Sequence, residues 1–350
     1  MIKKILSLII LATVSSTVAF AGNPDRIGEA GATHLLVNPW ARSSGWGGAN
    51  TACVSGLEAM RLNVGGLVRS DHNQIVFTNT DWFSGADIKI NSFGVKLKLG
   101  ESSAFGANVM SFSMGDFQRT TEEFPDGTLG SFSPNFTNIG VSYAYAFSEQ
   151  TSGGVTVRMI SESIADMNAT GVAIDAGIQY QSRNERFKLG FSLRNVGPSM
   201  QYSGDGVDIR VKEDGNSNAT ARTMKSRVAS FELPTVLNIG VAYVLTNPDS
   251  LINHNLTVAG NFMANSFGKD VIAVGLEYSY KDMLFLRGGY AYEEDVMDEE
   301  LSTNAASGPS FGATFQIPYS GDKTFGVDYS YRDTYNQFTG IHSVGVTLNF

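Results

Sequence analysis

The chain has 350 residues, a formal net charge of −9 and one cysteine, Cys53. The acidic balance and the lack of a run of Lys and Arg argue against nucleic-acid binding, and one thiol excludes an intramolecular disulfide and any site held by several cysteines. Glycine is abundant, at 38 residues, and proline is scarce, at 9, which favours many short strands joined by turns.

The first 21 residues have the layout of a secretory signal peptide. Lys3 and Lys4 precede an apolar run over residues 5–18, and an A-x-A pattern ends at Ala21, with Gly22 next. The apolar run is shorter than the ~20 residues that a spanning helix needs. We therefore expect export, with cleavage between Ala21 and Gly22.

Within the N-terminal segment, residues 22–72, the stretch from Gly28 to about His72 does not alternate between apolar and polar side chains and is dense in glycine. Residues 55–58 read SGLE, which predicts a capping box between Ser55 and Glu58 that opens a short helix through Arg61. We expect this segment to lie as a plug inside a barrel formed by residues 73–350. The alternative is a periplasmic extension that rests on the rim of the barrel.

From residue 74 onwards the dominant period is two. In residues 138–147, Ile139, Val141, Tyr143, Tyr145 and Phe147 share one face, while small and polar residues share the other. Such alternation predicts strands with one apolar and one polar face. The candidate strands are 74–82, 87–99, 103–113, 136–147, 152–162, 170–181, 186–195, 235–245, 253–264, 270–281, 283–293, 309–319, 324–333 and 340–350.

The connections between these strands alternate in length. Short connections near 100–102, 148–151, 182–185, 246–252, 281–282 and 320–323 separate longer ones at 114–135, 163–169, 196–234, 294–308 and 334–339. The connections at 83–86 and 265–269 belong to the second set but are short, which blurs the pattern slightly. A transmembrane barrel has short turns on its periplasmic rim and long loops on its extracellular rim. The pattern therefore predicts an all-β fold, a 14-stranded antiparallel transmembrane barrel in the bacterial outer membrane.

The composition of the two faces supports the barrel over a soluble sandwich. A soluble sheet exposes Lys, Glu and Arg on its wet face, whereas the polar face here is mainly Gly, Ser, Ala, Asn and Thr. Small polar residues suit a crowded lumen. Tyrosines and phenylalanines stand near the ends of the apolar faces, as the aromatic girdles of membrane barrels do.

Residues 41–49 read ARSSGWGGA, residues 63–67 read NVGGL and residues 193–197 read LRNVG. With two further stretches, these resemble the PorV/PorQ family, which is similar to FadL-type barrels. Residues 41–49 resemble the family's A-R-x-x-G-M-G-x-A opening, with Trp46 in the Met place. Residues 63–67, NVGGL, stand where the family has N-P-A-G-L, so the helix end loses a proline that fixes φ. The further matches are residues 115–116 (GD) with 125–128 (PDGT), 170–177 (TGVAIDAG) and 193–197 (LRNVG).

The resemblance implies a role in type IX secretion, with exported protein cargo, a translocon or an attachment complex as partner. The two longest loops are the candidates for binding that partner, because loops on a rigid scaffold commonly carry recognition. Within them we single out Phe117, Phe124, Asp126, Asp205 and Asp208. Two alternatives remain: a FadL-like channel for the uptake of hydrophobic small molecules, and a purely structural barrel.

The sequence carries no recognisable catalytic or cofactor-binding constellation, so we expect no enzyme activity, no cofactor and no metal. His342 and Ser343 are adjacent in a strand and must point to opposite faces, so they cannot act as a pair. The acidic run at residues 293–300 has carboxylates that suit Ca²⁺ but lacks the EF-hand spacing. We expect that run to be a solvated surface loop.

The last strand, residues 340–350, is expected to pair with the first and close the barrel, which leaves no open edge. It ends on Phe350 after alternating apolar residues. A terminal aromatic in this setting resembles the signal that barrel-assembly machinery reads, so that machinery and outer-membrane lipid join the expected partners.

Overall fold

The computed structural model describes residues 26–120, 124–127, 130–211, 222–246, 253–298, 302–304, 306–334 and 340–350. The predicted signal peptide, with Ala21 and Gly22, lies outside these residues. No helix within the described ranges has the length and apolar character needed to cross a membrane.

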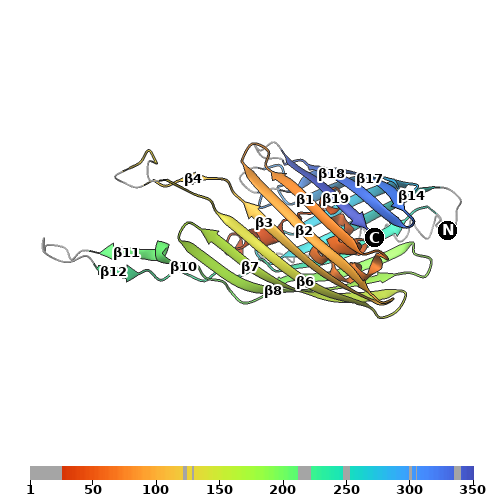
Figure 1. The fold of residues 1–350 in the computed structure, drawn as a ribbon, viewed down its shortest axis with the longest axis horizontal. Coiled ribbons are helices and arrows are strands. Elements are labelled where there is room, and N and C mark those ends of the chain that lie inside the picture. The colour runs from red at the N-terminus through yellow and green to blue at the C-terminus, as the bar shows by residue number, and fades with distance from the viewer. Residues whose placement is uncertain are drawn as a thin grey trace.

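The fold is a closed antiparallel barrel (Figure 1). Its sheet has 15 strands, of which the two-residue β10 (Ser203–Gly204) lies outside the ring, leaving 14. The ring closes because β1 pairs with β19 and β8 pairs with β9. The 14 strands are β1 (Gln74–Trp82), β2 (Ile88–Leu99), β3 (Ser103–Ser113), β6 (Asn135–Ala146), β7 (Thr151–Ile164), β8 (Met167–Gln181), β9 (Phe187–Val196), β13 (Val236–Val244), β14 (His254–Asn265), β15 (Val271–Tyr280), β16 (Leu284–Glu293), β17 (Gly308–Ser320), β18 (Lys323–Arg332) and β19 (Ile341–Asn349).

The predicted barrel and its strand count are confirmed, and most strand ends agree within one or two residues. The prediction was wrong at residues 163–169, which were expected to form a long loop. There β7 continues to Ile164 and β8 begins at Met167, so only Ala165 and Asp166 connect them. Ala165 takes a positive φ of 50°, which a two-residue hairpin turn requires.

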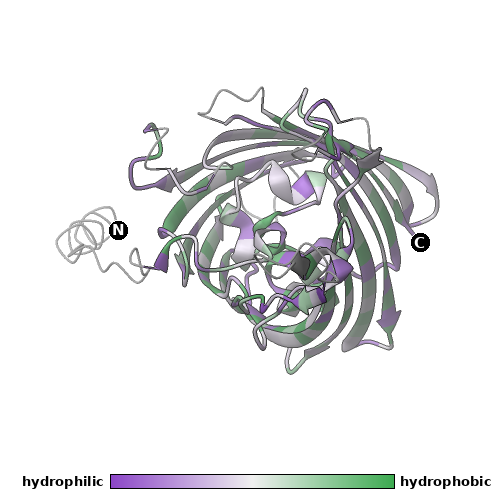
Figure 2. Cartoon of the chain, turned by 90° about the vertical axis from the view of Figure 1, so that its left-hand side faces the viewer, coloured by the Kyte–Doolittle hydropathy of each residue, from purple (hydrophilic) through white to green (hydrophobic). Residues whose placement is uncertain are grey.

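The two faces of the wall divide as the alternation predicts. On β6, Ile139, Val141 and Tyr143 are exposed on the outside, whereas Asn138 and Ser142 are buried inside. The stripes of hydropathy along the strands are visible in Figure 2. An apolar outer belt is the surface that a barrel presents to lipid, and the buried polar inner face is available to whatever fills the lumen.

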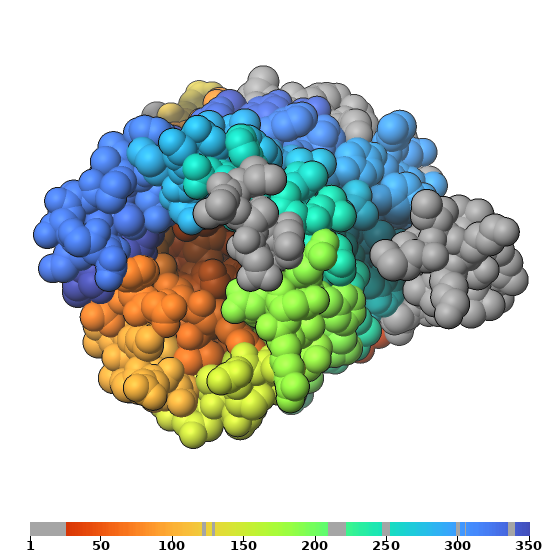
Figure 3. Space-filling view, turned by 90° about the vertical axis from the view of Figure 1, so that its right-hand side faces the viewer, coloured from red at the N-terminus to blue at the C-terminus, as the bar shows by residue number. Residues whose placement is uncertain are grey.

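The N-terminal segment, residues 26–72, fills much of the lumen, and we call it the plug. Figure 2 views it from the end that carries the long connections, which we call the loop end, and Figure 3 from the opposite turn end. Both views show it inside the ring of strands. Its elements are η2 (Thr33–Leu36), α2 (Ala41–Ser44), η3 (Ala49–Ala52), η4 (Gly56–Glu58), α3 (Ala59–Leu62) and η5 (Val64–Arg69).

The predicted capping box is wrong, although the short helix it was meant to open exists as η4 and α3. Glu58 accepts hydrogen bonds from the backbone N–H and the hydroxyl of Ser43, not from the residue at the start of its own helix. Burial raises the pKa of the Glu58 carboxyl, while nearby Arg42 opposes this shift. The carboxyl therefore ties two turns of the plug together.

Glycines in the wall let the plug approach closely. A Cβ added at Gly289 would lie 2.3 Å from the carbonyl oxygen of Trp46, and one at Gly275 would lie 2.9 Å from the indole ring. A Cβ at Gly45 of the plug would lie 2.8 Å from the Cα of Gly312. The glycines of the wall thus let Trp46, one of the residues that depart from the family pattern, pack closely against the strands.

Asn63 shapes the stretch in which the family's proline is missing. Its side-chain oxygen accepts from the N–H of Gly65 at 3.1 Å, which caps the start of η5. Its amide nitrogen donates to the carbonyls of Thr51 and Ile178 at 3.1 and 3.0 Å. Val64 occupies the first helical position, where a proline would also fit because that N–H needs no helical partner.

Candidate functional site

Two long connections leave the barrel at the loop end, and Figure 1 shows both extending beyond the ends of the strands. The first excursion, residues 114–134, contains the paired strands β4 (Phe117–Gln118) and β5 (Ser131–Phe132). The second excursion, residues 197–235, contains β10, η6 (Asp205–Val207), β11 (Asp208–Val211) and β12 (Arg222–Lys225). Each is a hairpin on a stem, not a shapeless loop.

The predicted partner-binding residues lie on these excursions. Phe117 is 47% exposed and stacks on Phe132 with ring centroids 5.8 Å apart. Phe124 is 46% exposed near the tip of the first excursion, where Asp126 is also exposed. Phe117 and Phe124 are therefore both accessible to a partner.

Asp205 and Asp208 belong to the second excursion. Asp205 is exposed in η6, and Asp208 is half-buried at the first position of β11. The structure therefore places the five predicted residues in two groups on separate hairpins. The aromatic candidates lie on the first hairpin and two of the three acidic candidates on the second.

Asp166, in the turn that the sequence interpretation missed, touches both excursions. Its carboxylate oxygens accept from Arg119 of the first excursion at 3.1 and 3.3 Å. Its backbone carbonyl accepts from Gly206 of the second at 3.4 Å, and β10 pairs with β8 beside it. The long β7–β8 hairpin thus joins the two excursions at one point.

The stem of the second excursion returns to the lumen and meets the plug. Met200 and Phe231 exchange backbone hydrogen bonds of 2.8 Å, and Met200 packs with Leu233 against the lumenal side of β8. Gly31 of the plug donates to the carbonyl of Glu232 at 3.1 Å. The plug and the second excursion are therefore hydrogen-bonded to each other.

A bulge in β9 helps to hold this junction. Asn195 has a positive φ of 60° and shifts the register between β8 and β9. Its backbone N–H donates to Asp175 at 2.7 Å, and its side-chain amide donates to the carbonyls of Pro234 and Leu35. One residue therefore links the wall, the excursion stem and the plug.

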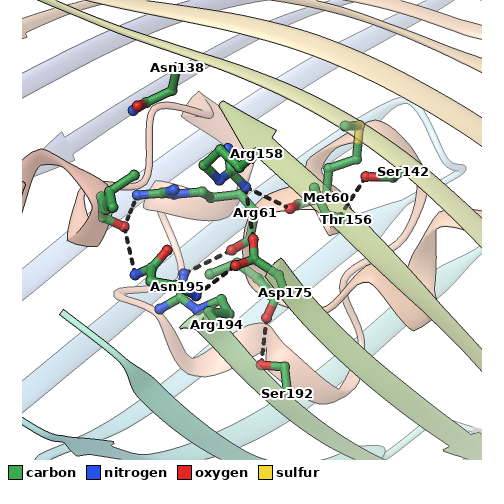
Figure 4. Close-up of polar contacts among 12 residues, drawn as sticks. Met60, Arg61, Asn138, Ser142, Thr156, Arg158, Asp175, Ser192, Arg194 and Asn195 are labelled. Atoms are coloured by element: carbon green, nitrogen blue, oxygen red, sulfur yellow. Dashed lines mark hydrogen bonds and ion pairs between the residues drawn. The ribbon is translucent and has the colours of Figure 1, made fainter. Parts of the chain in front are cut away.

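Below the junction, three guanidinium groups surround one carboxylate (Figure 4). Arg158 pairs with Asp175 at 2.9 Å, and both side chains are almost fully buried. The guanidinium of Arg61, in the plug, donates hydrogen bonds to the carbonyls of His34, Leu35 and Val37. Burial lowers the pKa of Arg61 well below its usual range, and the charges of the two neighbouring arginines act in the same direction.

The wall side of this cluster caps helix α3. The carbonyls of Met60, Arg61 and Leu62 accept from Arg158, Arg194 and Ser192, respectively. These are the carbonyls that a helix leaves without partners at its C-terminal end, and positive side chains there are favoured by the helix dipole. The plug's position in the barrel is thus set by side chains of β7 and β9.

A cavity of about 710 Å³ lies above the plug at the loop end. One side carries a row of rings, in which Trp82, Phe112, Phe136 and His34 follow each other with centroid distances of 6.2, 6.4 and 5.0 Å. Another part of the lining is polar and comprises Arg194, Asn238, Asn261 and Asn265 of strands β9, β13 and β14. The cavity is therefore apolar on one side and polar on another.

A smaller cavity of about 190 Å³ is lined by residues of the plug and of the wall, among them Glu58, Lys188 and Arg287. Cys53 also lines it, and burial raises the pKa of the thiol to about 12. Such a thiol stays protonated and unreactive. Trp46 lines this cavity, while Gly47 and Gly48 line the larger one, so a thin part of the plug separates the two.

The remaining predicted residues lie as follows. His342 faces outward beside Tyr329, with Nδ1 2.9 Å from the phenol oxygen, while Ser343 is buried in the lumen, so the two do point to opposite faces. Phe350 exchanges backbone hydrogen bonds with Asn73 at 3.0 and 2.9 Å, next to the β1–β19 seam. The prediction that it addresses the chain to assembly machinery stays a prediction.

The acidic run is not a uniformly solvated loop. Glu293 is fully buried in the lumen and accepts hydrogen bonds from Thr303 and Ser307. Asp295 pairs with Lys269 at 3.0 Å, while Glu299 and Glu300 lie outside the described residues. In the part of the chain that the structure describes, no three His, Cys, Asp or Glu side chains gather as metal ligands do.

Comparisons with known proteins agree with this architecture. A family model described as type IX secretion system protein PorV matches residues 23–214, more than half of the chain. No curated protein matches the sequence.

Among solved structures, the Pseudomonas putida toluene transporter TodX is 14% identical, with a TM-score of 0.54 over 89% of this chain and 98% of that one. The CymD monoaromatic hydrocarbon channel is 13% identical, with a TM-score of 0.55 over 90% and 98%. A Pseudomonas aeruginosa FadL homologue is 11% identical, with a TM-score of 0.51 over 88% and 98%. At these identities the likeness shows the fold alone.

Proposed function

Because the chain belongs to the PorV family of type IX secretion proteins, we propose that it binds exported protein or a translocon partner through its two excursions. In this proposal it does so from the bacterial outer membrane, where antiparallel barrels with an even number of strands are found. In this proposal the loop end faces the outside of the cell and the turn end faces the periplasm, the side on which short turns lie in such barrels.

The observation that carries the proposal is the joined pair of excursions. The first exposes Phe117 and Phe124, and the second exposes Met224, which is 57% accessible. Aromatic residues and methionine are enriched in protein interfaces. Since Asp166 holds both hairpins to the same β-turn, a partner could touch both without reordering the barrel.

The first test is native co-purification from outer membranes with two shortened variants. In one, two glycines replace residues 208–225 between Val207 and Ser226, which are already joined by a backbone hydrogen bond of 3.1 Å. In the other, two glycines replace residues 120–129 between Arg119 and Gly130, joined at 2.8 Å. Both variants are expected to form the barrel and to lose the partner.

The wild-type chain should recover an exported protein or a secretion component in this experiment. If the wild type recovers neither, or if both shortened variants recover as much as the wild type, the proposal is wrong. If only one of the two shortened variants loses the partner, the excursion shortened in that variant is the one that carries the contact. The barrel itself is checked by its heat-modifiable migration in gels.

A FadL-like uptake channel is the second candidate, and the ring-lined side of the larger cavity is what favours it. Such a channel needs a route past the plug, and Trp46 with Gly47 stands where that route would pass. Uptake of a radiolabelled monoaromatic hydrocarbon by cells with and without the protein tests this candidate. Equal uptake would remove it.

A further inference from the structure

The larger cavity carries an excess of positive charge in a chain whose net charge is −9. The residues of its lining that bear a full charge are Arg194, Lys269 and Arg332, all cationic. Lys269 pairs with Asp295. Among the described residues, Arg194 and Arg332 have no carboxylate within ion-pair distance.

Arg194 is the most deeply placed of these cations. Arg194 is only 5% exposed, and its Nη1 donates to the carbonyl of Arg61 at 2.8 Å. Its Nε has no hydrogen-bond partner among the described residues. Behind it lie Arg61 and Arg158, with Asp175 as the carboxylate of the cluster. Three buried cations thus share the one carboxylate of Asp175, and an excess of buried positive charge is unfavourable, so this arrangement favours the entry of an anion.

Beside Arg194 the polar lining offers hydrogen-bonding groups of both kinds. In the described part of the chain, the amide nitrogen of Asn238 and the side-chain oxygens of Asn261 and Asn265 have no hydrogen-bond partner. The three residues are buried and belong to the cavity lining. Hydrocarbons need neither donors nor acceptors, whereas each residue of a peptide backbone presents one of each.

The spacing of the polar groups also suits an extended chain. Asn261, Met263 and Asn265 follow each other on the lumenal face of β14, at steps of roughly 6.6 Å along the strand. Alternate residues of an extended peptide repeat over the same length. The row of rings from Trp82 to His34 provides an apolar surface for side chains on the other edge of such a peptide.

We propose that this cavity binds an extended, acidic peptide segment, with a carboxylate at Arg194, backbone groups at Asn238 and Asn261, and apolar side chains against the aromatic row. The inference rests on the proposed function, because it takes exported protein as the source of the segment. A volume of about 710 Å³ admits a few residues, not a folded domain. The cavity would therefore read a short motif, while the excursions hold the rest of the partner.

The test uses the purified full chain in detergent and two blocked pentapeptides. One has an aspartate between two phenylalanines, and its twin has asparagine in place of the aspartate. Binding is measured by calorimetry, with acetate alone as a third probe. We expect the acidic peptide to bind at least tenfold more tightly than its twin, and acetate to compete only weakly.

Arg194→Gln is expected to abolish the difference between the two peptides, while Arg194→Lys keeps part of it. Arg183→Gln, an exposed arginine in a connection at the turn end, is the matched control and should change nothing. Should Arg194→Gln fail to fold, the comparison of the two peptides on the wild-type chain still decides. Equal affinities there, or acetate competing as well as the peptide, would overturn the inference.

The outcome is separable from that of the proposed function. A chain that captures its partner through the excursions but binds the two peptides equally keeps the function and loses this site. A chain that prefers the acidic peptide but captures no partner in membranes loses the function and keeps the site.

Discussion

The plug and the two excursions have opposite relations to the barrel. Side chains of the plug such as Leu35, Trp40 and Leu67 are fully buried, and its polar groups bond to the wall at many points. The excursions touch the barrel mainly at Asp166 and at the stem around Met200, and they expose large apolar side chains. Burial and hydrogen bonding to the wall keep the plug in place. The excursions have few such contacts with the barrel, so they remain available to a partner.

The comparison predicts that the same chemical change costs much in the plug's surroundings and little on the excursions. Asp175→Asn removes the carboxylate that lies among three buried arginines, and we expect a loss of about 3–5 kcal/mol of stability. Thermal unfolding in detergent, followed by gel migration and tryptophan fluorescence, measures this loss.

Asp166→Asn is the control, because it makes the same change in an ion pair with Arg119 that is exposed to solvent. Exposed pairs contribute little, since water already solvates both charges. We expect no measurable shift of its unfolding temperature. Equal shifts for Asp175→Asn and Asp166→Asn would show that burial does not separate the two regions.

A second prediction concerns pH and the plug alone. Burial lowers the pKa of His34 to about 4, and the charges of Arg61 and Arg158 act in the same direction, although Glu162 lies 3.3 Å from Nδ1. A released plug would regain an ordinary histidine pKa of about 6.5. Between pH 6.5 and 4 the released state therefore binds the extra proton, and the bound plug loses up to about 3 kcal/mol as the pH falls.

Protease sensitivity of the plug, compared at pH 7 and pH 4.5, measures this effect. In His34→Gln the amide can keep the contact with Asn138, and the increase in cleavage at low pH should shrink. His254→Gln, at an exposed position of β14, should retain the wild-type response. A His34→Gln chain with an unchanged pH response would contradict the assignment to His34.

A third, smaller effect is expected where the plug meets glycine in the wall. Gly289→Ala places a methyl group against the backbone of Trp46, and overpacking of this kind costs about 1–3 kcal/mol. Gly288→Ala changes the next residue of the same strand, where an added Cβ has open space. Only the first variant should unfold at a lower temperature.

The barrel itself could be predicted from the sequence because each strand repeats one simple rule. Alternation fixes which side chains face the lumen, so the outward position of Ile139 and the lumenal position of Ser142 follow from it without knowledge of the contacts. Loop lengths were harder to predict. Residues 163–169 were expected to form a loop, yet both strands continue because they pair with each other along their whole length.

The plug could not be derived in the same way, because its shape depends on partners that are distant in the sequence. Glu58 satisfied a local capping pattern with Ser55, but the nearby Ser43 offers two donors. Arg158 and Arg194 cap α3 by hydrogen bonds to carbonyls that lie 98 and 133 positions away in the sequence, respectively. Buried charges on a lumenal face were the signal that could have drawn attention to them.

The last prediction is the smallest in stability and concerns the first excursion. Phe117→Ser removes the stack on Phe132 from a hairpin that is already exposed, so we expect a change within about 0.5 kcal/mol. Co-purification of the partner should nevertheless fall several-fold, because a solvent-exposed ring can contribute to the binding of a partner while it contributes little to the stability of the fold. The matched control is Phe311→Ser, which removes an exposed ring from the outward face of β17 and should disturb membrane insertion instead. A Phe117→Ser chain that is destabilised like a plug variant, or that captures its partner normally, would mean that the excursions are part of the scaffold and that the contrast between the two regions does not hold.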